Sequence, residues 1–390
     1  MTDTKHPASN TGRDGPLWEL TSLGQSVWLD YIRRGILDNG ELETMIREKA
    51  LRGVTSNPAI FEQAIARSDD YDDALRGLAE RGTEANDAYE ALAIEDIQRA
   101  ADLFATIYEE AGGHDGFVSL EVSPELAHDT DGTLAEARRL WSIVDRPNVM
   151  IKVPGTEAGL PAIEQLIAEG INVNVTLLFS LAGYERVMEA YLTGLERRAA
   201  EGDSIERVAS VASFFISRVD SAVDAELEKK LETASSEHEK ERIRALFGRA
   251  AIANAKLAYH RFREIFDAER FRKLADRGAR VQRPLWASTS TKNPDYRDVV
   301  YVEELIGPDT VNTMPLATVE AFADHGAARR TIDADLAGAR AELQALADLG
   351  VDLDAVTEQL QVEGVEKFVT PFRHLLKCVG EKLSEVGSRS

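Results

Sequence analysis

Short segments rich in apolar and β-branched residues recur along the chain, and they alternate with longer stretches that have helical spacing. The helical spacing is clear in 131–144 and 159–168, where apolar residues return every three or four positions. The short segments predict eight strands, at 25–32, 53–57, 117–123, 149–154, 171–179, 208–217, 283–289 and 310–315.

The alternation of strands with helices predicts parallel strands joined by right-handed crossovers. The strand segments are apolar at both odd and even positions, as expected for strands covered on both faces. Eight such units favour an α/β fold of the closed (βα)8 type, the TIM barrel. An open, doubly wound sheet is the alternative.

The chain is longer than such a barrel needs, since it has 390 residues and a barrel takes about 250. The surplus is predicted to be helical: a helix near 41–50, an insertion at 222–277 and C-terminal helices over 316–386. The insertion is dense in Glu, Lys, Arg and Ala, which indicates a solvated helical surface. We expect residues 1–15 to be a flexible tail and 16–390 to form a single domain.

The charge balance excludes several classes of partner. The net charge is −23, from 68 acidic and 45 basic residues, which argues against nucleic acid and against an anionic membrane surface. A small phosphorylated ligand needs only a local positive pocket. Cys378 is the one cysteine, and neither a secretory signal nor a membrane-spanning run is present. These features predict a soluble, cytoplasmic protein.

Lys152 follows three apolar residues of a predicted strand and precedes Val153 and Pro154. A lysine at the end of a buried strand has to be paired, neutral, or able to reach the open end of the barrel. Burial favours the uncharged amine, which is the form that attacks a carbonyl group. The alternative is a structural lysine that extends its charged end to solvent.

Other polar residues lie near the carboxyl ends of the predicted strands, which form one ring in a barrel and carry its active site. For each of these residues the alternative is a structural role instead of a functional one. Asn57 before Pro58 is a good helix N-cap, and Glu121 could be a surface charge. The hydroxyls of Thr176 and Ser213 could bond to their own backbone. The residues concerned are Asp30, Asn57, Glu121, Asn174, Thr176, Ser213 and Ser288.

The segment 287–293 combines hydroxyls, backbone N–H groups and Lys292 after a strand, and Arg218 follows another strand. This chemistry suits a phosphate, although a plain polar loop would look the same. The seven histidines form no close pair typical of a metal site, and no P-loop or GxGxxG pattern is present. The sequence therefore predicts neither a metal nor a nucleotide cofactor.

Three segments resemble signatures of the transaldolase family: GVTSNPAIF (53–61), VMIKVPGTEAGLPAIEQL (149–166) and NVTLLFS (174–180). The resemblance covers about 17–380 and is nearest to the longer bacterial members. It implies a metal-independent transferase of the pentose phosphate pathway that moves a dihydroxyacetone unit between sugar phosphates, with no cofactor. It leaves open a monomer or a homodimer.

The resemblance also implies roles for single residues. Lys152 would form the Schiff base, Asp30 would take the proton of the substrate C4 hydroxyl, and Glu121 and Thr176 would hold a catalytic water. Phe215 stands where related fructose-6-phosphate aldolases tend to carry a tyrosine, which favours transfer over cleavage. The substrate would be bound by Asn57, Asn174 and Ser213 at its hydroxyls and by Arg218, Ser288 and Lys292 around its phosphate.

Three alternatives remain at this point. The chain could be a Schiff-base aldolase that releases free dihydroxyacetone, or a sugar-phosphate sensor without catalytic activity. It could also be a helical interaction protein, an interpretation that only the segment 222–277 supports.

Overall fold

The eight predicted strands form one closed barrel. The computed structural model describes residues 14–387, and in it every neighbouring pair of strands is parallel. The last strand pairs with the first, which confirms the barrel and excludes an open sheet. The strands are β1 Gln25–Leu29, β2 Leu51–Thr55, β3 Phe117–Glu121, β4 Val149–Pro154, β5 Val173–Leu178, β6 Ser210–Phe215, β7 Arg283–Ala287 and β8 Thr310–Met314.

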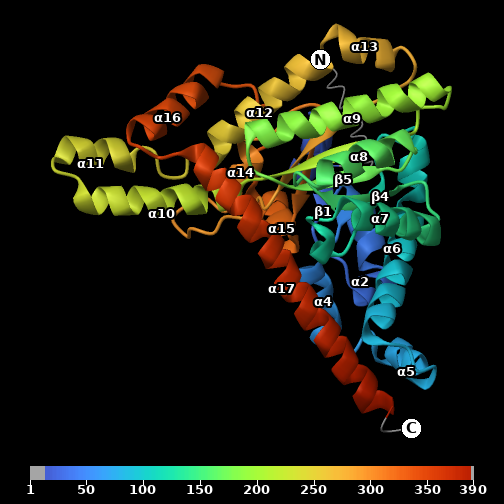
Figure 1. Cartoon of the computed structure of the whole chain (residues 1–390). Helices are drawn as coiled ribbons and strands as arrows, with labels where there is room; N and C mark the ends of the chain where they lie inside the picture. Colours follow the sequence, from blue (N-terminus) through green and yellow to red (C-terminus); the bar gives the residue numbers. More distant parts are fainter. Residues whose placement is uncertain (1–13, 388–390) are drawn as a thin grey trace, which may run out of the picture.

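Helices surround this barrel, and several extend away from it (Figure 1). In chain order they are α1 Pro16–Ser22, α2 Arg34–Asp38, α3 Glu41–Glu48, α4 Pro58–Ala66, α5 Asp72–Glu80, α6 Ala85–Glu110, the short 3-10 helix η1 Pro124–Leu126, α7 Thr130–Val144, α8 Gly159–Ala168, α9 Leu181–Glu201, α10 Ser217–Thr233, α11 Glu237–Arg244, α12 Ala250–Phe266, α13 Glu269–Ala275, α14 Val300–Glu303, α15 Leu316–His325, α16 Leu336–Asp348 and α17 Leu353–Gly387.

The buried apolar side chains form one continuous cluster that runs from Leu17 in α1 to Leu383 in α17. A shared core is what a single domain requires, and the single domain over 16–390 stays our prediction. The predicted tail at 1–15 falls almost wholly on residues 1–13, which lie outside the described residues; α1 begins at Pro16.

The segment 222–277 is helical, but the expected solvated surface applies to only part of it. In Figure 1, α10 and α11 project from the body of the molecule, and α11 buries only Ile243. Helix α12, in contrast, packs against α9, α10 and α16 and buries most of its length. Its run of alanines lets these neighbours approach closely, and the charged residues on either side of α12 obscured this in the overall composition.

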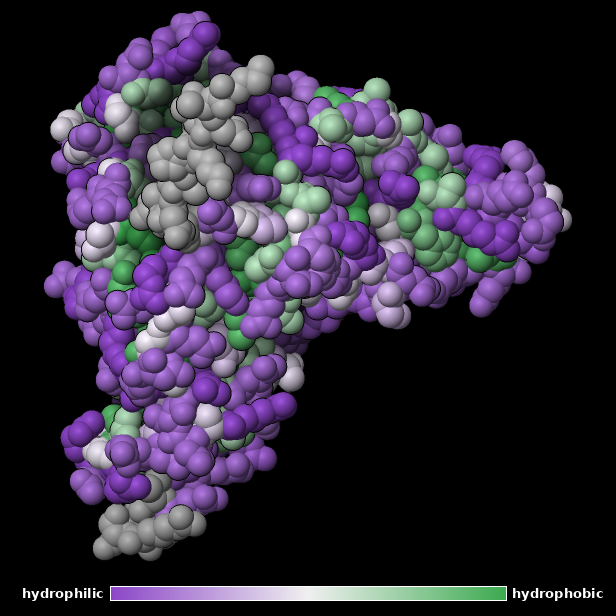
Figure 2. Space-filling model, turned by 180° about the vertical axis from the view of Figure 1, so that it is seen from behind, coloured by the Kyte–Doolittle hydropathy of each residue, from purple (hydrophilic) through white to green (hydrophobic). Residues whose placement is uncertain are grey.

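Helix α17 crosses the mouth of the barrel at the carboxyl ends of the strands (Figure 1). It packs against α4, α10 and η1, which directly follow β2, β6 and β3, and it also touches β5. The predicted C-terminal helices thus contribute a wall to the strand ends. Figure 2 shows that the face behind this view is mostly hydrophilic, with small separate apolar patches.

Among the helices of residues 14–387, none is both long enough and apolar enough to pass through a membrane.

Candidate active site

A cavity of about 360 Å³ opens at the carboxyl ends of the strands, on the side that α17 covers. Its lining draws on β2, β4, β5, β6, β7 and β8, on the segments after β1, β2, β6, β7 and β8, and on α17. The ring of strand ends expected from the sequence is therefore a single hollow. Eight predicted site residues line it: Asp30, Asn57, Lys152, Thr176, Ser213, Arg218, Ser288 and Lys292.

Lys152 lines this cavity and is only 5% exposed. Its Nζ donates to the Ser56 carbonyl oxygen at 3.1 Å and lies 3.5 Å from Glu121 Oε2. The strand register sets this pair, because Glu121 on β3 stands directly opposite Lys152 on β4. A lysine whose charged end reaches solvent is therefore excluded.

Glu121 is also buried, and its Oε1 makes no hydrogen bond within the described residues. Burial raises the pKa of its carboxyl from 4.5 to about 7, although the positive charge of Lys152 opposes the shift. A surface charge is excluded for this residue too. A carboxyl with a pKa near neutrality can give and take protons at physiological pH, and this one lies 3.5 Å from the lysine amine.

Asp30, at the end of β1, accepts a hydrogen bond at Oδ1 from Thr55 Oγ1 at 2.7 Å. The Thr55 and Thr313 hydroxyls are 2.6 Å apart. A hydroxyl has a single hydrogen, so Thr313 donates to Thr55 while Thr55 donates to Asp30. Burial raises the pKa of Asp30, and the charge of Lys152 partly offsets the rise. The chain of hydroxyls holds one carboxylate oxygen of Asp30, which lines the cavity.

Thr176 lies on β5, which pairs with β4 on the side away from Glu121. Its Oγ1 is buried and makes no hydrogen bond within residues 14–387. The next residue, Leu177, has φ +61°, a left-handed conformation that is costly for a bulky side chain. It coincides with the irregular register between β5 and β6. The structure thus holds a strained bend directly beside Thr176.

The two asparagines have different environments. Asn57 lines the cavity and also caps α4, because its Oδ1 accepts from the Ile60 N–H at 3.0 Å. Asn174 does not line the cavity: it donates to Ser119 Oγ at 3.0 Å and accepts from Ser213 Oγ at 2.7 Å. The cap uses only Oδ1 of Asn57, so the side-chain NH2 group of this residue can still bind a substrate. Substrate binding by both asparagines stays a prediction. For Asn174, the geometry shows that the residue orients the Ser213 hydroxyl.

The opposite end of the cavity is basic. The Arg218 guanidinium carbon lies 5.0 Å from the centre of the Phe215 ring, and its Nη1 is buried without a hydrogen-bond partner in the described part of the chain. Ser288 has φ +57° and its hydroxyl lies 3.0 Å from that of Ser217, the first residue of α10. Lys292 sits exposed at the rim and donates to Ser290 Oγ at 3.0 Å.

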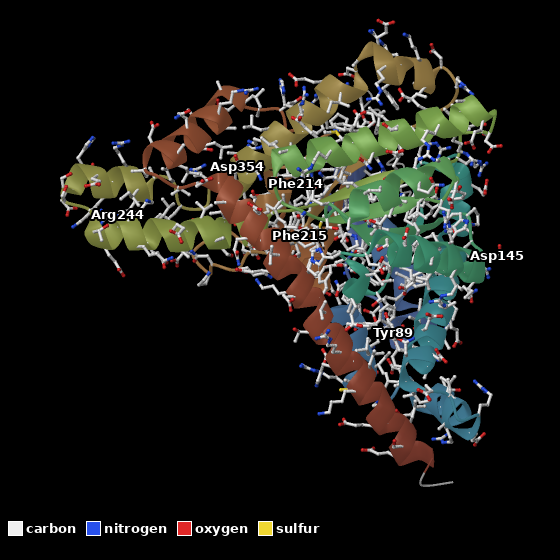
Figure 3. All side chains as sticks on the ribbon, in the orientation of Figure 1. Tyr89, Asp145, Phe214, Phe215, Arg244 and Asp354 are labelled. Carbon is white, nitrogen blue, oxygen red and sulfur yellow. The ribbon has the colours of Figure 1, made fainter. Side chains whose placement is uncertain are left out.

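Phe214 and Phe215, both labelled in Figure 3, are adjacent on β6, so their side chains point to opposite faces of the strand. Phe214 packs outward against Tyr184 of α9, whereas Phe215 lines the cavity beneath the middle of α17. Phe215, the position at which related fructose-6-phosphate aldolases tend to carry a tyrosine, therefore forms part of the cavity wall.

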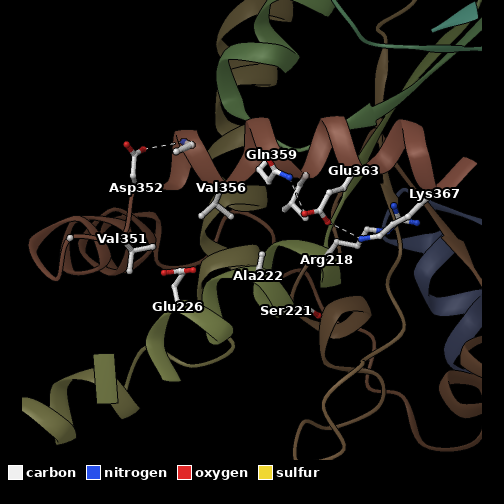
Figure 4. Close-up of a pocket in the computed structure, with 13 residues that line it drawn as sticks. Arg218, Ser221, Ala222, Glu226, Val351, Asp352, Val356, Gln359, Glu363 and Lys367 are labelled. Atoms are coloured by element: carbon white, nitrogen blue, oxygen red, sulfur yellow. Dashed lines mark hydrogen bonds and ion pairs between the residues drawn. The ribbon is translucent and has the colours of Figure 1, made fainter. Parts of the chain in front are cut away.

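A second, open groove of about 830 Å³ runs between α10 and α17 (Figure 4). Arg218 lines both the groove and the cavity, so the two spaces meet at its side chain. The remaining lining of the groove mixes Glu226, Asp352 and the ion pair of Glu363 with Lys367.

Four residues of the site were not found from the sequence. Thr55 lies two positions before Asn57, and the alternation of side chains along a strand could have found it. Thr313 lies on β8, for which no site residue was proposed. Gln361 and Phe368 belong to α17, and no local pattern distinguishes them from other helix residues.

Within residues 14–387, no group of three or more His, Cys, Asp or Glu side chains is placed to hold a metal ion. A reaction without metal or cofactor stays a prediction.

The raised pKa of Glu121 predicts a specific dependence of stability on pH. Between pH 4.5 and about 7 the folded chain keeps a proton on Glu121 that the unfolded chain has lost, so this residue makes stability fall as pH rises through that window. Glu121→Gln should remove this fall. Its free energy of unfolding relative to that of the wild type should therefore increase by about 1–3 kcal/mol between pH 5 and pH 8, at ~1.4 kcal/mol per pKa unit. Urea unfolding at several pH values measures it.

The matched control is Glu80→Gln, on the exposed side of α5, which should follow the wild-type curve at every pH. Parallel curves for Glu121→Gln and the wild type would contradict the assignment of the shift to Glu121.

Comparison with known proteins places this geometry in a family. The family model described as transaldolase/fructose-6-phosphate aldolase matches residues 27–379. A transaldolase of Parafrankia sp. is 50% identical over 96% of this chain and 99% of its own length. Transaldolase 1 of Streptomyces coelicolor is 49% identical over 97% of both chains. A transaldolase of Trichodesmium erythraeum is 46% identical over 95% of this chain and 98% of its own.

The match thus runs from β1 into α17 and includes every strand that contributes to the cavity. With a family model over most of its length and relatives near half identity along their whole length, the chain belongs to the transaldolase/fructose-6-phosphate aldolase family.

Proposed function

We propose that this protein is a transaldolase. It moves a dihydroxyacetone unit from a ketose phosphate, sedoheptulose 7-phosphate or fructose 6-phosphate, to glyceraldehyde 3-phosphate or erythrose 4-phosphate. The observation that carries the proposal is the buried Lys152 amine, 3.5 Å from the Glu121 carboxyl, in a cavity that Asp30 and Arg218 also line. A Schiff-base enzyme needs this combination of an amine, proton-transfer groups and a basic end for the phosphate.

The reaction begins with the attack of the free Lys152 amine on the C2 carbonyl of the ketose. The N–C2 bond forms, and the carbonyl oxygen leaves as water after it has been protonated. Glu121 and Thr176 flank the lysine from β3 and β5, and each has a buried oxygen without a partner in the described residues. Both oxygens are available to hold a water molecule that carries these protons.

The iminium then acts as the electron sink for cleavage. Asp30 takes the proton of the C4 hydroxyl, the C3–C4 bond breaks, and its electron pair moves to the iminium nitrogen as an enamine forms. An aldose phosphate leaves. The enamine carbon C3 attacks the aldehyde of the acceptor, Asp30 returns the proton to the new hydroxyl, and hydrolysis of the iminium frees the product.

The phosphate end is supported by charge and by helix geometry. Arg218 offers a forked donor whose Nη1 is unpartnered, and α10 begins at Ser217 without a side-chain cap, so its N-terminus favours an anion. Lys292 and Ser288 add a cation and a hydroxyl from the segment after β7. This local positive end lets a protein of net charge −23 bind a phosphorylated sugar.

The decisive experiment is borohydride reduction in the presence of fructose 6-phosphate. We expect loss of activity and a single covalent adduct in the peptide that contains Lys152, because borohydride reduces the iminium to a stable amine. Borohydride without sugar is the control and should leave the enzyme active. An adduct on another lysine, or none, would overturn the proposal.

Product analysis separates transfer from simple cleavage. With erythrose 4-phosphate as acceptor, we expect sedoheptulose 7-phosphate; without an acceptor, release of dihydroxyacetone should be slow. Steady release at the rate of transfer would instead favour an aldolase. Phe215, which gives this wall of the cavity no hydroxyl, supports transfer.

We also propose that the enzyme is cytoplasmic and that it is a monomer or a homodimer. Cell fractionation and light scattering after size-exclusion chromatography test them.

A further inference from the structure

One face of α17 closes over the reactive lysine. Gln361, Gly364 and Phe368 are spaced by three and four positions, so they share this face. Gln361 Nε2 donates to the carbonyl oxygens of Gly155 and Leu177, both at 3.1 Å. Gln361 thereby bridges the chain just beyond Lys152 on β4 and just beyond Thr176 on β5, and it holds the strained carbonyl of Leu177.

Gly364 fixes how closely the helix approaches. A Cβ atom at this position would come within 2.9 Å of the Leu177 side chain, so the absence of a side chain lets α17 pack directly against this strand end. Gln361 and Gly364 together set the height of the next turn of the helix above the cavity.

That next turn carries Phe368. It is 5% exposed, it lines the cavity, and the centre of its ring is 5.6 Å from Lys152 Nζ. The distance lies within the range in which an aromatic face attracts a cation. Phe368 is the one α17 residue in the lining of the cavity, so it forms the contribution of this helix to the wall around Nζ.

This position matters most after the Schiff base has formed, because Nζ then carries the positive charge of the iminium. The enzyme-bound three-carbon enamine has two fates. In transfer, C3 forms a bond to the acceptor aldehyde. In the side reaction, C3 takes a proton, water adds to C2, the C2–N bond breaks, and free dihydroxyacetone leaves with the lysine amine restored.

We propose that Phe368 is an active-site residue that directs the enzyme-bound three-carbon unit toward transfer, by covering the nitrogen of the Schiff base and keeping water, the proton donor of the side reaction, from C3 of the enamine. An apolar ring at this place excludes water from the reacting carbon, while its π face stabilises the cation that a purely aliphatic wall would leave without compensation. The inference rests on the proposed transaldolase function and adds the residue that controls its side reaction.

The test measures the ratio of free dihydroxyacetone to transferred product, with fructose 6-phosphate as donor and erythrose 4-phosphate as acceptor. Phe368→Leu removes the ring and keeps most of the volume, and Phe368→Ala also opens space for water. We expect the ratio to rise about 2-fold to 30-fold in Phe368→Leu, the range that loss of a cation–π contact allows, and further in Phe368→Ala. Borohydride should still trap an adduct on Lys152 in both variants.

Phe372→Leu is the matched control. Phe372 lies one turn further along α17, is 6% exposed, and packs at 5.8 Å against the ring of Tyr89 instead of lining the cavity. Its loss should lower the melting temperature about as much as Phe368→Leu does and leave the product ratio unchanged. If Phe368 only packed α17 against the barrel, Phe368→Leu and Phe372→Leu would change the product ratio to the same extent.

The outcomes separate the inference from the function on which it rests. If wild-type enzyme gives no Lys152 adduct, the proposed function fails. If the adduct forms in the wild type and in Phe368→Leu, but the product ratio of Phe368→Leu equals that of Phe372→Leu, the role of Phe368 is wrong. Phe368→Leu decides this even where Phe368→Ala does not fold.

Discussion

Lys152→Met is expected to abolish covalent trapping by borohydride and to lower kcat/KM at least about 10⁴-fold, because the other lysine of the cavity, Lys292, lies exposed at the rim and not beside Glu121. The change should spare the fold. Methionine is similar in length and apolar, and without the lysine charge the pKa of Glu121 rises further, so the neighbouring carboxyl stays protonated and neutral at pH 7. Trapping with fructose 6-phosphate and steady-state transfer rates measure the two effects.

Lys292→Met is the control for this prediction. Lys292 lines the same cavity but is exposed at its rim. Its loss should raise KM for phosphorylated donors while leaving the adduct on Lys152 intact. An adduct of wild-type yield in Lys152→Met would mean that another residue is the nucleophile.

The fold was predictable because its signals are local and repeated. Each strand is a short run of apolar residues followed by a helix, and eight repeats leave few architectures other than a barrel. The errors lie at boundaries, such as 208–217, where the apolar pattern continues through Ile216 although α10 already begins at Ser217. They also lie in α12, whose burial depends on partners far away in the sequence.

The candidate site was predictable to the extent that parallel strands bring their ends together. Lys152 and Glu121 meet because β3 and β4 pair in register, and a polar residue within an apolar run marks each of them. Phe368 lies 216 positions after Lys152 in the sequence numbering. It reaches the lysine only because Gln361 and Gly364 seat α17 on the strand ends, and no periodicity in the sequence encodes that contact.

The sequence pattern also does not show which hydrogen-bond partners a polar side chain has. Asn174 was grouped with the substrate ligands, yet the structure engages its amide with Ser119 and Ser213. Thr55 was unremarked, yet it fixes the Asp30 carboxylate. These assignments depend on tertiary distances of about 3 Å, which residue type and spacing do not determine.

Asp30→Asn should lower kcat by about 10²-fold to 10⁴-fold, the usual contribution of one positioned proton-transfer group, and still form the Schiff base. Asparagine can accept the hydrogen bond that Thr55 donates, so the variant keeps the packing and loses only the base. Asp30→Ala should lose as much turnover and also release the Thr55 hydroxyl, which makes it the less stable of the two. Transfer assays and thermal unfolding measure these differences.

The mass of the trapped adduct identifies the step at which the reaction stops. Without a base for the C4 hydroxyl proton, the C3–C4 bond does not break, so reduction of Asp30→Asn with fructose 6-phosphate should leave the whole phosphorylated six-carbon sugar on Lys152. Wild-type enzyme should also yield the three-carbon adduct, because cleavage proceeds and the aldose phosphate leaves.

A three-carbon adduct at wild-type yield in Asp30→Asn would assign the base to another residue. Failure of that variant to trap any sugar would instead place Asp30 in the formation of the Schiff base. Asp30 lines the cavity from the end of β1, whereas Glu121 contacts the amine from β3. We therefore expect Asp30 to act in cleavage of the C3–C4 bond and Glu121 to act in formation and hydrolysis of the Schiff base.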